Sequence, residues 1–523
     1  MKTITRVEGP GPVPAARSTW SGVDAAAARC LTKAVEFAVE SQTSDGAWRF
    51  PSEPRVLENA VVACSLAGVK EARAARERAV RWLEGAAPQQ HDAFVAAADR
   101  WLVELTCTGS TAKTVVPSLP VSEGPHARRA LYLHALGCAV AGAGADARLL
   151  LQQSRAALGA DGGRRIKPWQ RTMLLAFEAI ACSVLGMPVP PHTLHEWERA
   201  QSPDGSFFGM PLVTGMLHLA LRRMAPEHHV TRRCLTGLLA GQQPDGTWRF
   251  LVSEVWDTGL LVRALRGHPL FQTAALPAAL KFLASAQKED GGWACTAPLD
   301  SDNDTTGNSL LALAGTDRAG QIRPAATHYA LRHQTPEGLW TTWHSSDDSP
   351  APDVVAHMAA GIHAAALPGI DLAPARSWLA SLATEGGWNS DWYIPPAYGA
   401  AEIGAAIGRR PQRRAAARAL LGSQRRDGGW PRIPGEPYSS PTATGLALTA
   451  LTTSGLELPD AALRHALRFL IDSQNDDGTW NDRPVMYGPR PFLTSTTTQV
   501  HALAARGLRH ALTTVESRDG ATP

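Results

Sequence analysis

Hydrophobic positions recur about every three to four residues along most of the chain, which is the spacing of one face of an α-helix. Two kinds of segment alternate. The first is amphipathic, as in residues 278–286 and 461–472, and the second is dense in small apolar residues, as in residues 308–314, 441–452 and 497–504. The alternation predicts an all-α protein in which an outer helix with one apolar face is followed by an inner helix packed on all sides.

A short phrase separates the two helices of each pair. It consists of Gln, two residues, an acidic residue, Gly, one residue and an aromatic residue, and Gly supplies the positive φ that ends a helix. From Trp248 onward the aromatic residues lie roughly 40 to 50 residues apart, the length of one helical hairpin in a repeat array. We assign these aromatic residues to packing between units. Copies of the phrase, some of them degenerate, end at Trp48, Phe207, Trp248, Trp293, Trp340, Trp388, Trp430 and Trp480.

The repeats divide the chain into regions. Six helix pairs are counted from about residue 228, enough to close a ring of outer and inner helices, an (α/α)6 barrel. Residues 25–227 hold two copies of the phrase and a longer, less regular middle, which predicts a second helical domain of related architecture. We therefore expect an N-terminal segment over 1–24, one helical domain over 25–227 and a barrel over 228–523, in keeping with the length of 523 residues. The repeats alone leave a plain helical solenoid open.

The inner helices of the barrel all begin shortly after the repeated aromatic residue, so their N-termini meet at one end. This end is the expected mouth of a cavity. Aromatic residues near these starts are candidates for an apolar wall whose π faces stabilise carbocations, with simple core packing as the alternative. These candidates are Trp256, Trp343, Trp392, Tyr393, Tyr398, Tyr487 and Phe492.

One inner start is crowded with acids, because Asp300, Asp302 and Asp304 alternate there. A calcium loop of the EF-hand type needs Gly at its sixth position and Glu at its twelfth. Counted from Asp300, those positions hold Thr305 and Leu311, which argues against a calcium loop. Helix capping by Asp, Asn and Thr explains one or two of the polar residues, but not five of them at the start of an inner helix.

A proton donor is the third interpretation. An alkene is a very weak base, so its donor is a carboxylic acid that stays protonated at neutral pH. Burial and a neighbouring like charge both raise the pKa of a carboxyl group. Asp302 and Asp304 offer both effects at a cavity wall. The helix dipole favours the ionised form near an N-terminus, and we expect it to keep Asp302 as the anion of the pair.

The repeated phrase resembles the QW motifs of squalene-hopene and related cyclases, and residues 255–258, Val-Trp-Asp-Thr, are similar to a phrase in their barrel. The resemblance to class II terpene cyclases covers most of the chain and implies their βγ pair of helical domains, with 25–227 as the γ-like and 228–523 as the β-like domain. These enzymes carry an Asp-x-Asp-Asp motif, commonly followed by Thr, whose middle aspartate protonates the substrate. Alignment on Thr306 makes Asp304 that acid and puts Thr305 where the family usually has its last Asp. The alternative register, which starts at Asp300, makes Asp302 the donor.

The Asp-x-Asp-Thr-Thr form resembles the motif of bacterial drimenyl diphosphate synthases. The resemblance implies a sesquiterpene cyclase that converts farnesyl diphosphate into drimenyl diphosphate and retains the diphosphate. A class II diterpene cyclase that makes a copalyl-type diphosphate from geranylgeranyl diphosphate is the alternative. Squalene cyclases share the barrel, but they are usually longer and hold the full acidic motif. The class I signature Asp-Asp-x-x-Asp is not found, so ionisation of the diphosphate is not expected.

The resemblance also implies that the retained diphosphate binds near the junction of the domains, usually with Mg²⁺. Basic residues of the N-terminal domain are candidates for its anchor, with a solvated basic face as the alternative: Arg164, Arg165, Lys167, Arg128 and Arg129. The acidic magnesium motif of plant relatives is not preserved. Glu84 and Asp92 lie in the comparable region and are the candidate metal ligands.

Composition excludes several other classes. The 51 Lys and Arg nearly balance the 48 Asp and Glu, so there is no electrostatic case for a nucleic-acid partner. Seven cysteines are scattered singly, which argues against a zinc ribbon or a disulfide scaffold and indicates a reducing cytoplasm. We see no signal peptide and no apolar run long enough for a transmembrane helix. The expected partner is a small-molecule prenyl diphosphate, and the oligomeric state stays open.

Two further functions remain as alternatives. A non-catalytic helical repeat that binds peptides also alternates outer and inner helices, but it needs no acidic, aromatic mouth. A protein prenyltransferase subunit shares the barrel, yet its zinc site needs an Asp-x-Cys pair, and no Asp lies two residues before Cys295.

Overall fold

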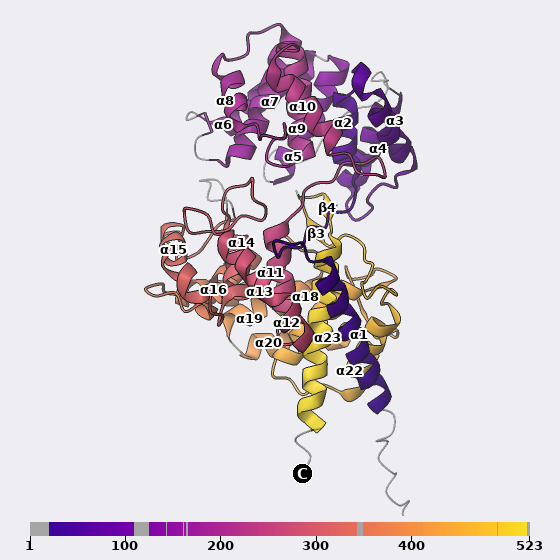
Figure 1. Cartoon of the computed structure of the whole chain (residues 1–523), viewed down its shortest axis with the longest axis vertical. Helices are drawn as coiled ribbons and strands as arrows, with labels where there is room; N and C mark the ends of the chain where they lie inside the picture. The colour runs from indigo at the N-terminus through magenta and orange to yellow at the C-terminus, as the bar shows by residue number, and fades with distance from the viewer. Residues whose placement is uncertain are drawn as a thin grey trace, which may run out of the picture.

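The computed structural model describes residues 20–108, 125–142, 144–159, 162–163, 166–342, 349–408, 410–488 and 490–519. In these ranges the protein consists of helices and two small antiparallel hairpins, which confirms the all-α prediction. The hairpins are β1 (Trp430–Pro431) with β2 (Ser439–Ser440) and β3 (Met486–Tyr487) with β4 (Leu493–Thr494), paired Trp430 to Ser440 and Met486 to Thr494. Figure 1 shows two helical bodies, one above the other.

The lower body in Figure 1 is a barrel with a closed inner ring. Each inner helix contacts the next one along the chain, and α23 contacts α11. Small residues allow this close approach, since a Cβ added at Gly307 would lie 2.4 Å from the backbone of His357 on the next inner helix. The inner helices are α11 (Glu254–Leu265), α14 (Asn303–Leu313), α16 (Pro352–Ala364), α18 (Pro396–Tyr398) continued by η2 (Gly399–Ile403) and α19 (Gly404–Ile407), α21 (Pro441–Thr453) and α23 (Thr497–Asp519).

The outer helices cover this ring with one apolar face each. In α22, for example, the buried residues Leu463, Ala466, Leu467 and Leu470 form one stripe at helical spacing. The outer helices are α1 (Trp20–Ser41), α12 (Pro269–Ala274) followed by α13 (Leu276–Ser285), α15 (Ala319–Arg332), α17 (Ala373–Ser381), α20 (Arg410–Ser423) and α22 (Asp460–Asp472). The predicted barrel of outer and inner helices is therefore present.

The upper body has a hydrophobic core of its own, whose residues lie between Val56 and Trp248 except for Ala294, Leu299 and Phe492. Helices α2, α7 and α9 pack side by side in it, and α5 contacts all three. Its elements are α2 (Val56–Ser65), η1 (Lys70–Ala72), α3 (Arg73–Gly85), α4 (Ala93–Thr108), α5 (Pro125–Ala141), α6 (Gly144–Leu158), α7 (Pro168–Leu185), α8 (His192–Ala200), α9 (Pro211–Met224) and α10 (His229–Ala240).

In the copies that keep its glutamine, the repeated phrase links one outer helix of the barrel to the next. In the copy that begins at Gln287, the side-chain amide donates to Gly291 O at 2.9 Å and to Ile322 O of the next outer helix at 3.1 Å. Gly291 has φ 92°, and a Cβ there would collide with the same helix. Trp293 Nε1 donates to Leu283 O at 2.7 Å, which fixes the ring beneath its own outer helix. The assignment of these tryptophans to packing between units agrees with this geometry.

The copies of the phrase that end at Trp48 and Trp248 each contact a different helix from the one that follows them in the sequence. Trp48 N donates to Thr258 Oγ1 on α11, the inner helix that follows Trp248 in the sequence. Trp248 N donates instead to Asn59 Oδ1 on α2, the helix that follows Trp48. The two connecting segments pass side by side, since Phe250 N donates to the Ser52 hydroxyl at 3.1 Å. The chain thus leaves the barrel after α1, builds the upper body and returns at α11.

This crossing corrects the predicted domain boundaries. Helix α1 belongs to the barrel, because its apolar residues lie in the same core as α11, α22 and α23, and Figure 1 shows it beside α23. Gln474 closes the outer ring by donating to Cys30 O of α1 at 2.9 Å. Helix α10 and Trp248 instead pack in the upper core. The upper body therefore spans about residues 56–248, and the barrel combines α1 with residues from Glu254 onward.

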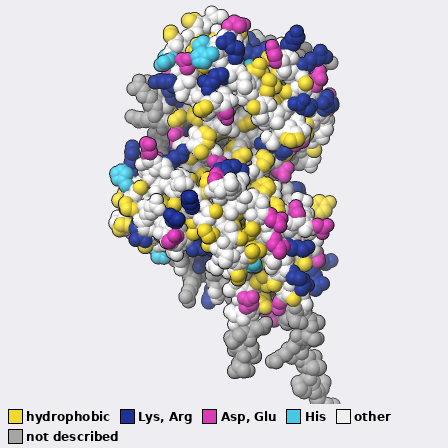
Figure 2. Space-filling view, in the orientation of Figure 1, with side chains coloured by type: hydrophobic (Ala, Val, Ile, Leu, Met, Phe, Trp, Pro, Cys, Tyr) yellow, Lys and Arg dark blue, Asp and Glu magenta, His cyan; other side chains and the backbone are white. Residues whose placement is uncertain are grey.

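The surface visible in Figure 2 carries charges of both signs, and the cysteines form no disulfide bonds in the described structure. Figure 2 shows Lys, Arg, Asp and Glu intermixed over both lobes of the visible face. All seven cysteines are free. Among the described helices, none has the length and apolarity needed to cross a lipid bilayer.

The ring closure by Gln474 yields a test. Gln474→Ala removes hydrogen bonds to Cys30 O and Gly478 O, both 2.9 Å long, and we expect a loss of about 1 to 2 kcal/mol in unfolding free energy, measured by urea denaturation. Gln334→Ala is the matched control, because its bonds to Gly338 O and Asp371 O are longer, 3.2 and 3.5 Å. Equal losses in both variants would contradict the special role of the α22 to α1 junction.

Candidate active site

A cavity of about 140 Å³ lies between the two bodies at the N-terminal ends of the inner helices. Its wall is predominantly apolar and comes from the upper body, the two crossing segments and the barrel. The lining residues are Ser52, Tyr132, Trp169, Met210, Leu212, Val213, Phe250, Leu251, Ser253, Trp256, Cys295, Leu299, Asp302, Asp304, Thr305, Thr342, Trp392, Met486, Tyr487, Gly488, Thr494, Thr496 and Gln499. The predicted cavity is thus present at the predicted end of the barrel.

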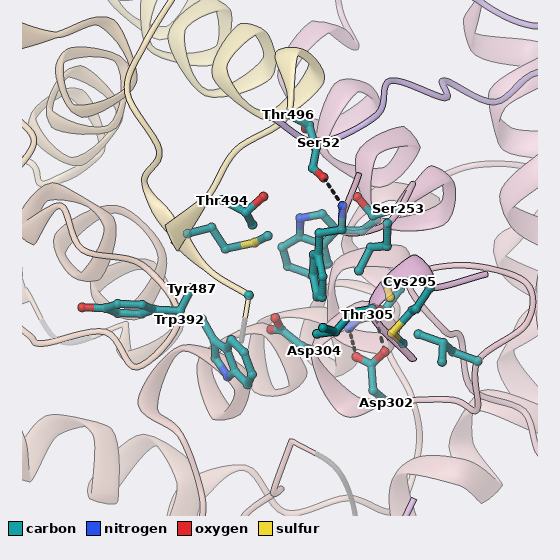
Figure 3. A pocket seen from close by; sticks show the side chains of 18 of the residues that line it. Ser52, Ser253, Cys295, Asp302, Asp304, Thr305, Trp392, Tyr487, Thr494 and Thr496 are labelled. Carbon is teal, nitrogen blue, oxygen red and sulfur yellow. Dashed lines mark hydrogen bonds between the residues drawn. The ribbon is translucent and has the colours of Figure 1, made fainter. Parts of the chain in front are cut away.

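The acidic motif forms the first turn of α14. Asp302 is the N-cap, and its carboxylate accepts from Thr305 N at 2.6 Å and from the Thr305 hydroxyl at 2.9 Å (Figure 3). The Thr306 hydroxyl donates to Asp302 O and accepts from Trp293 N. Thr306 does not line the cavity, so its contacts join the repeated phrase to the inner helix. Thr305 and Asp302 do line it.

Asp304 lines the cavity (Figure 3) and contacts a histidine. Its Oδ1 lies 2.6 Å from Nδ1 of His357, a side chain of α16 that is 1% exposed. Among the described residues, none donates a hydrogen bond to the other carboxylate oxygen, Oδ2. Asp300 is exposed and lies outside the cavity. The geometry therefore favours the register in which Asp302 and Asp304 are the first two acids of the motif.

Three buried aspartates occupy the first turns of neighbouring inner helices. Burial raises the pKa of Asp302 and of Asp257 to about 7, against the hydrogen bonds that favour their ionised forms. Burial and the charge of Asp304 raise the pKa of Asp353 to about 6. Burial thus opposes the ionised form that we expect for Asp302, whereas its N-cap hydrogen bonds favour that form. Together these acids retain protons close to neutral pH.

His357 lies between two carboxylates. Its Nε2 is 3.6 Å from Glu402 Oε2 and 3.3 Å from the Tyr398 hydroxyl. Burial disfavours the imidazolium, but the charges and hydrogen bonds of Asp304 and Glu402 outweigh it and raise the pKa of His357 to about 9. At neutral pH the ring is therefore an imidazolium whose Nδ1–H points at Asp304.

Sequence reasoning missed His357 and Glu402. Each lies in an inner segment rich in small apolar residues, where a single polar residue is ordinarily explained by local packing. The signal that identifies them is spatial, since the closed inner ring brings α14, α16 and η2 together. No spacing within the chain connects Asp304 with a histidine 53 residues later.

The aromatic candidates divide into groups. Trp256, Trp392 and Tyr487 line the cavity. Tyr393 and Tyr398 do not, and their rings stack at 3.8 Å within the barrel core. Phe492 packs in the upper core, and Trp343 lies outside the described residues. The lining aromatic residues that the sequence did not indicate are Tyr132, Trp169 and Phe250.

The basic candidates do not form an anchor in the described structure. Arg164 and Arg165 lie outside the described residues, as do the side chains of Arg128 and Arg129 in α5. Lys167 is buried and donates from Nζ to Ser301 O at 2.6 Å. Its charge lowers the pKa of Asp302, against the larger effect of burial, so it lies at the acid end of the cavity. Lys167 therefore contacts the acidic motif.

The metal candidates lie apart from one another. Glu84 is exposed and near Cys107, whereas Asp92 caps α4 by accepting from Val95 N at 3.0 Å. Among the described residues, the one cluster of three side chains able to hold a metal ion is Glu198, His228 and His229, and none of these lines the cavity. The donor set of Glu84 and Asp92 therefore does not fit a protein-built magnesium site.

The fold is that of a known terpene cyclase. The ent-copalyl diphosphate synthase from Streptomyces platensis superposes with a TM-score of 0.59 over 94% of this chain and 99% of that chain, at 17% sequence identity. At this identity the likeness establishes the shared fold. The predicted resemblance to class II terpene cyclases is confirmed at this level.

Two curated proteins with the name drimenyl diphosphate synthase are similar in sequence. The one from Streptantibioticus cattleyicolor is 30% identical over 328 residues, and the one from Streptomyces showdoensis is 29% identical over 359 residues. These alignments cover 56% and 65% of this chain and 60% and 59% of the relatives, so part of each relative is unmatched. No protein-family model matches the chain.

The raised pKa of His357 predicts a pH dependence of stability. A group whose pKa is higher in the folded state stabilises the fold below its unfolded pKa, about 6.5, and loses that contribution as the pH rises through the folded value, here about 9. We expect His357→Gln to flatten the decline of the urea midpoint between pH 6.5 and 9.5. His363→Gln, at an exposed position of the same helix, should leave the decline unchanged. A wild-type midpoint constant over this range would refute the assignment.

Proposed function

We propose that this protein is a class II sesquiterpene cyclase that protonates farnesyl diphosphate and releases drimenyl diphosphate with the diphosphate intact. One observation carries the proposal: the carboxyl group of Asp304 borders an apolar, aromatic cavity and has an imidazolium at its back. A non-catalytic repeat that binds peptides does not require a carboxyl group beside an imidazolium at the wall of an apolar cavity. The names of the two sequence relatives support the farnesyl substrate.

The chemistry begins at Asp304. In the reactive form the carboxyl group of Asp304 is protonated. Because Nδ1–H of His357 is donated to Oδ1, the acidic proton is on Oδ2, and it passes to the terminal alkene of the substrate. The new carboxylate forms opposite an imidazolium, which stabilises the charge as it develops. Asp302 and Thr305 hold the first turn of α14, so that the acid keeps its position. The reaction needs no other proton donor.

The cavity wall then guides cyclisation. Proton addition leaves a tertiary carbocation, and attack by the next alkenes forms two carbon–carbon bonds. The bicyclic cation loses one proton, so product and substrate are isomers. The π faces of Trp256, Trp392 and Tyr487 lie along the wall and stabilise positive charge, and the apolar lining excludes water from the cation. The wall therefore favours ring closure over hydration.

We place the diphosphate at the end of the cavity formed by Tyr487, across from Asp302 in Figure 3. The guanidinium of Arg490 lies 4.9 Å from the Tyr487 ring centroid, and the charges of Arg490 and Asp92 both act on the Tyr487 hydroxyl. In this orientation the retained diphosphate lies away from the carboxyl group of Asp304. Mg²⁺ would accompany the diphosphate as its counterion, since Mg²⁺ commonly binds substrate phosphates through few protein ligands.

The acid is tested by Asp304→Asn. We expect this variant to fold normally and to lose at least about 1,000-fold in turnover, because an amide cannot protonate an alkene. Asp300→Asn, at the exposed acid that precedes the motif, is the matched control and should keep wild-type activity. Product formation is measured by mass spectrometry after enzymatic dephosphorylation. An active Asp304→Asn enzyme would overturn the assignment.

Substrate and product are tested together. Farnesyl diphosphate should give a higher kcat/KM than geranylgeranyl diphosphate at one Mg²⁺ concentration, and the product should retain both phosphates. Chelation of Mg²⁺ should raise KM with a smaller effect on kcat, because the ion serves binding. A preference for geranylgeranyl diphosphate would identify a copalyl-type enzyme, and stoichiometric release of pyrophosphate would contradict the class II mechanism.

A further inference from the structure

A chain of buried charges continues from His357 into the centre of the barrel. Glu402 Oε2 lies 3.6 Å from His357 Nε2 and 2.6 Å from an Arg263 guanidinium nitrogen, and Glu402 Oε1 accepts from Arg506. The Glu402 side chain is 4% exposed. Together with Asp304 these residues come from five of the inner segments, α14, α16, η2, α11 and α23. Glu402 is thus the anionic centre of the network.

We propose that Glu402 is a positioning residue that holds His357 as an imidazolium and so fixes the proton of Asp304 on the oxygen that borders the cavity. The inference rests on the proposed function, because it concerns how the acid of that reaction is prepared. Glu402 does not line the cavity. Its effect passes through the ring of His357.

The charge of Glu402 is fixed by its partners. Guanidinium groups stay protonated in proteins, and although burial opposes ionisation, Arg263 and Arg506 hold the pKa of Glu402 well below its usual value. Arg263 is held in turn by Asn308 Oδ1 at 2.9 Å. A carboxylate held in this way cannot take the proton of His357. It acts as a permanent anion next to Nε2.

The charge on His357 decides where the acidic proton resides. A neutral imidazole with a free Nδ1 lone pair would accept the proton of Asp304 across the 2.6 Å contact. Asp304 would then be a carboxylate with no proton to transfer to the substrate. An imidazolium already carries hydrogen on Nδ1. It donates to Oδ1, leaves the acidic proton on Oδ2, and remains a cation when Asp304 becomes a carboxylate.

The charge of Asp304 supports the imidazolium only while Asp304 is ionised. In the protonated form of the acid, Glu402 still supports a positive charge on His357, whereas Arg263 and Arg506 oppose it. Without Glu402, the cations Arg263 and Arg506 would remain and oppose a positive charge on His357. The segment that carries Glu402 is also unusual, because η2 is a π-helical turn, a feature that is rare and frequent at functional sites. The groups around His357 are Asp304 from α14, Asp353 from its own helix, Tyr398 from α18, Glu402 from η2, Trp256 and Arg263 from α11, and Arg506 from α23.

Two substitutions separate charge from shape. Glu402→Gln keeps the size and a hydrogen-bond acceptor but removes the charge, whereas Glu402→Asp keeps the charge on a shorter side chain. The readouts are the titration of His357 by NMR with ¹³C-labelled histidine, assigned by comparison with His357→Gln, and the pH profile of kcat with farnesyl diphosphate. A purely structural role would favour Gln over Asp.

In Glu402→Gln we expect the titration of His357 to move at least one pH unit lower, with kcat at pH 7.5 reduced at least tenfold and the alkaline limb of its profile shifted the same way. Glu402→Asp should restore most of the change in the His357 titration and most of the loss in kcat. If the single variant does not fold, Glu402→Gln/Arg506→Met removes one cation along with the anion and should still titrate lower. An unchanged His357 titration in folded Glu402→Gln would overturn the proposal. The NMR result stands even if farnesyl diphosphate is not turned over, so failure of the proposed function is distinguishable.

Discussion

The side-chain amide of the repeated glutamine is the constraint on which the barrel depends. It closes the turn of its own phrase and reaches a carbonyl of the next outer helix, as Gln287 and Gln424 show. In the units that keep the glutamine, each outer helix is therefore joined to the next in the same way, and the inner helices all start at one end. The cavity, the acidic first turn of α14 and the aromatic wall gather there for that reason.

Burial of charge is the second feature of the molecule. An unpaired charge in a low-dielectric interior costs several kcal/mol, so Glu402, Arg263, Arg506 and His357 are stable only as a group. The same network keeps a cation behind Asp304, where it serves the proposed chemistry. The barrel core thus combines apolar packing with one internally compensated electrostatic element.

The local parts of this structure could be predicted from the sequence, and the connections between distant parts could not. Helix pairs, the repeated phrase and the Asp302 to Thr306 segment are each encoded within a few residues. The partner of a given phrase is not, because the copies ending at Trp48 and Trp248 have the same local chemistry and differ only in which inner helix they join. His357 escaped prediction for a similar reason, since only ring closure brings it to Asp304.

The crossing of the two connecting segments has a consequence for how the protein is made. Helix α1 is synthesised before its partners α22 and α23, and the contact between Cys30 and Gln474 spans 444 residues. The upper body, complete by about residue 248, can fold while the barrel is still unfinished. During that interval the apolar face of α1 has no partner helices, so the barrel closes only after α22 and α23 have been synthesised.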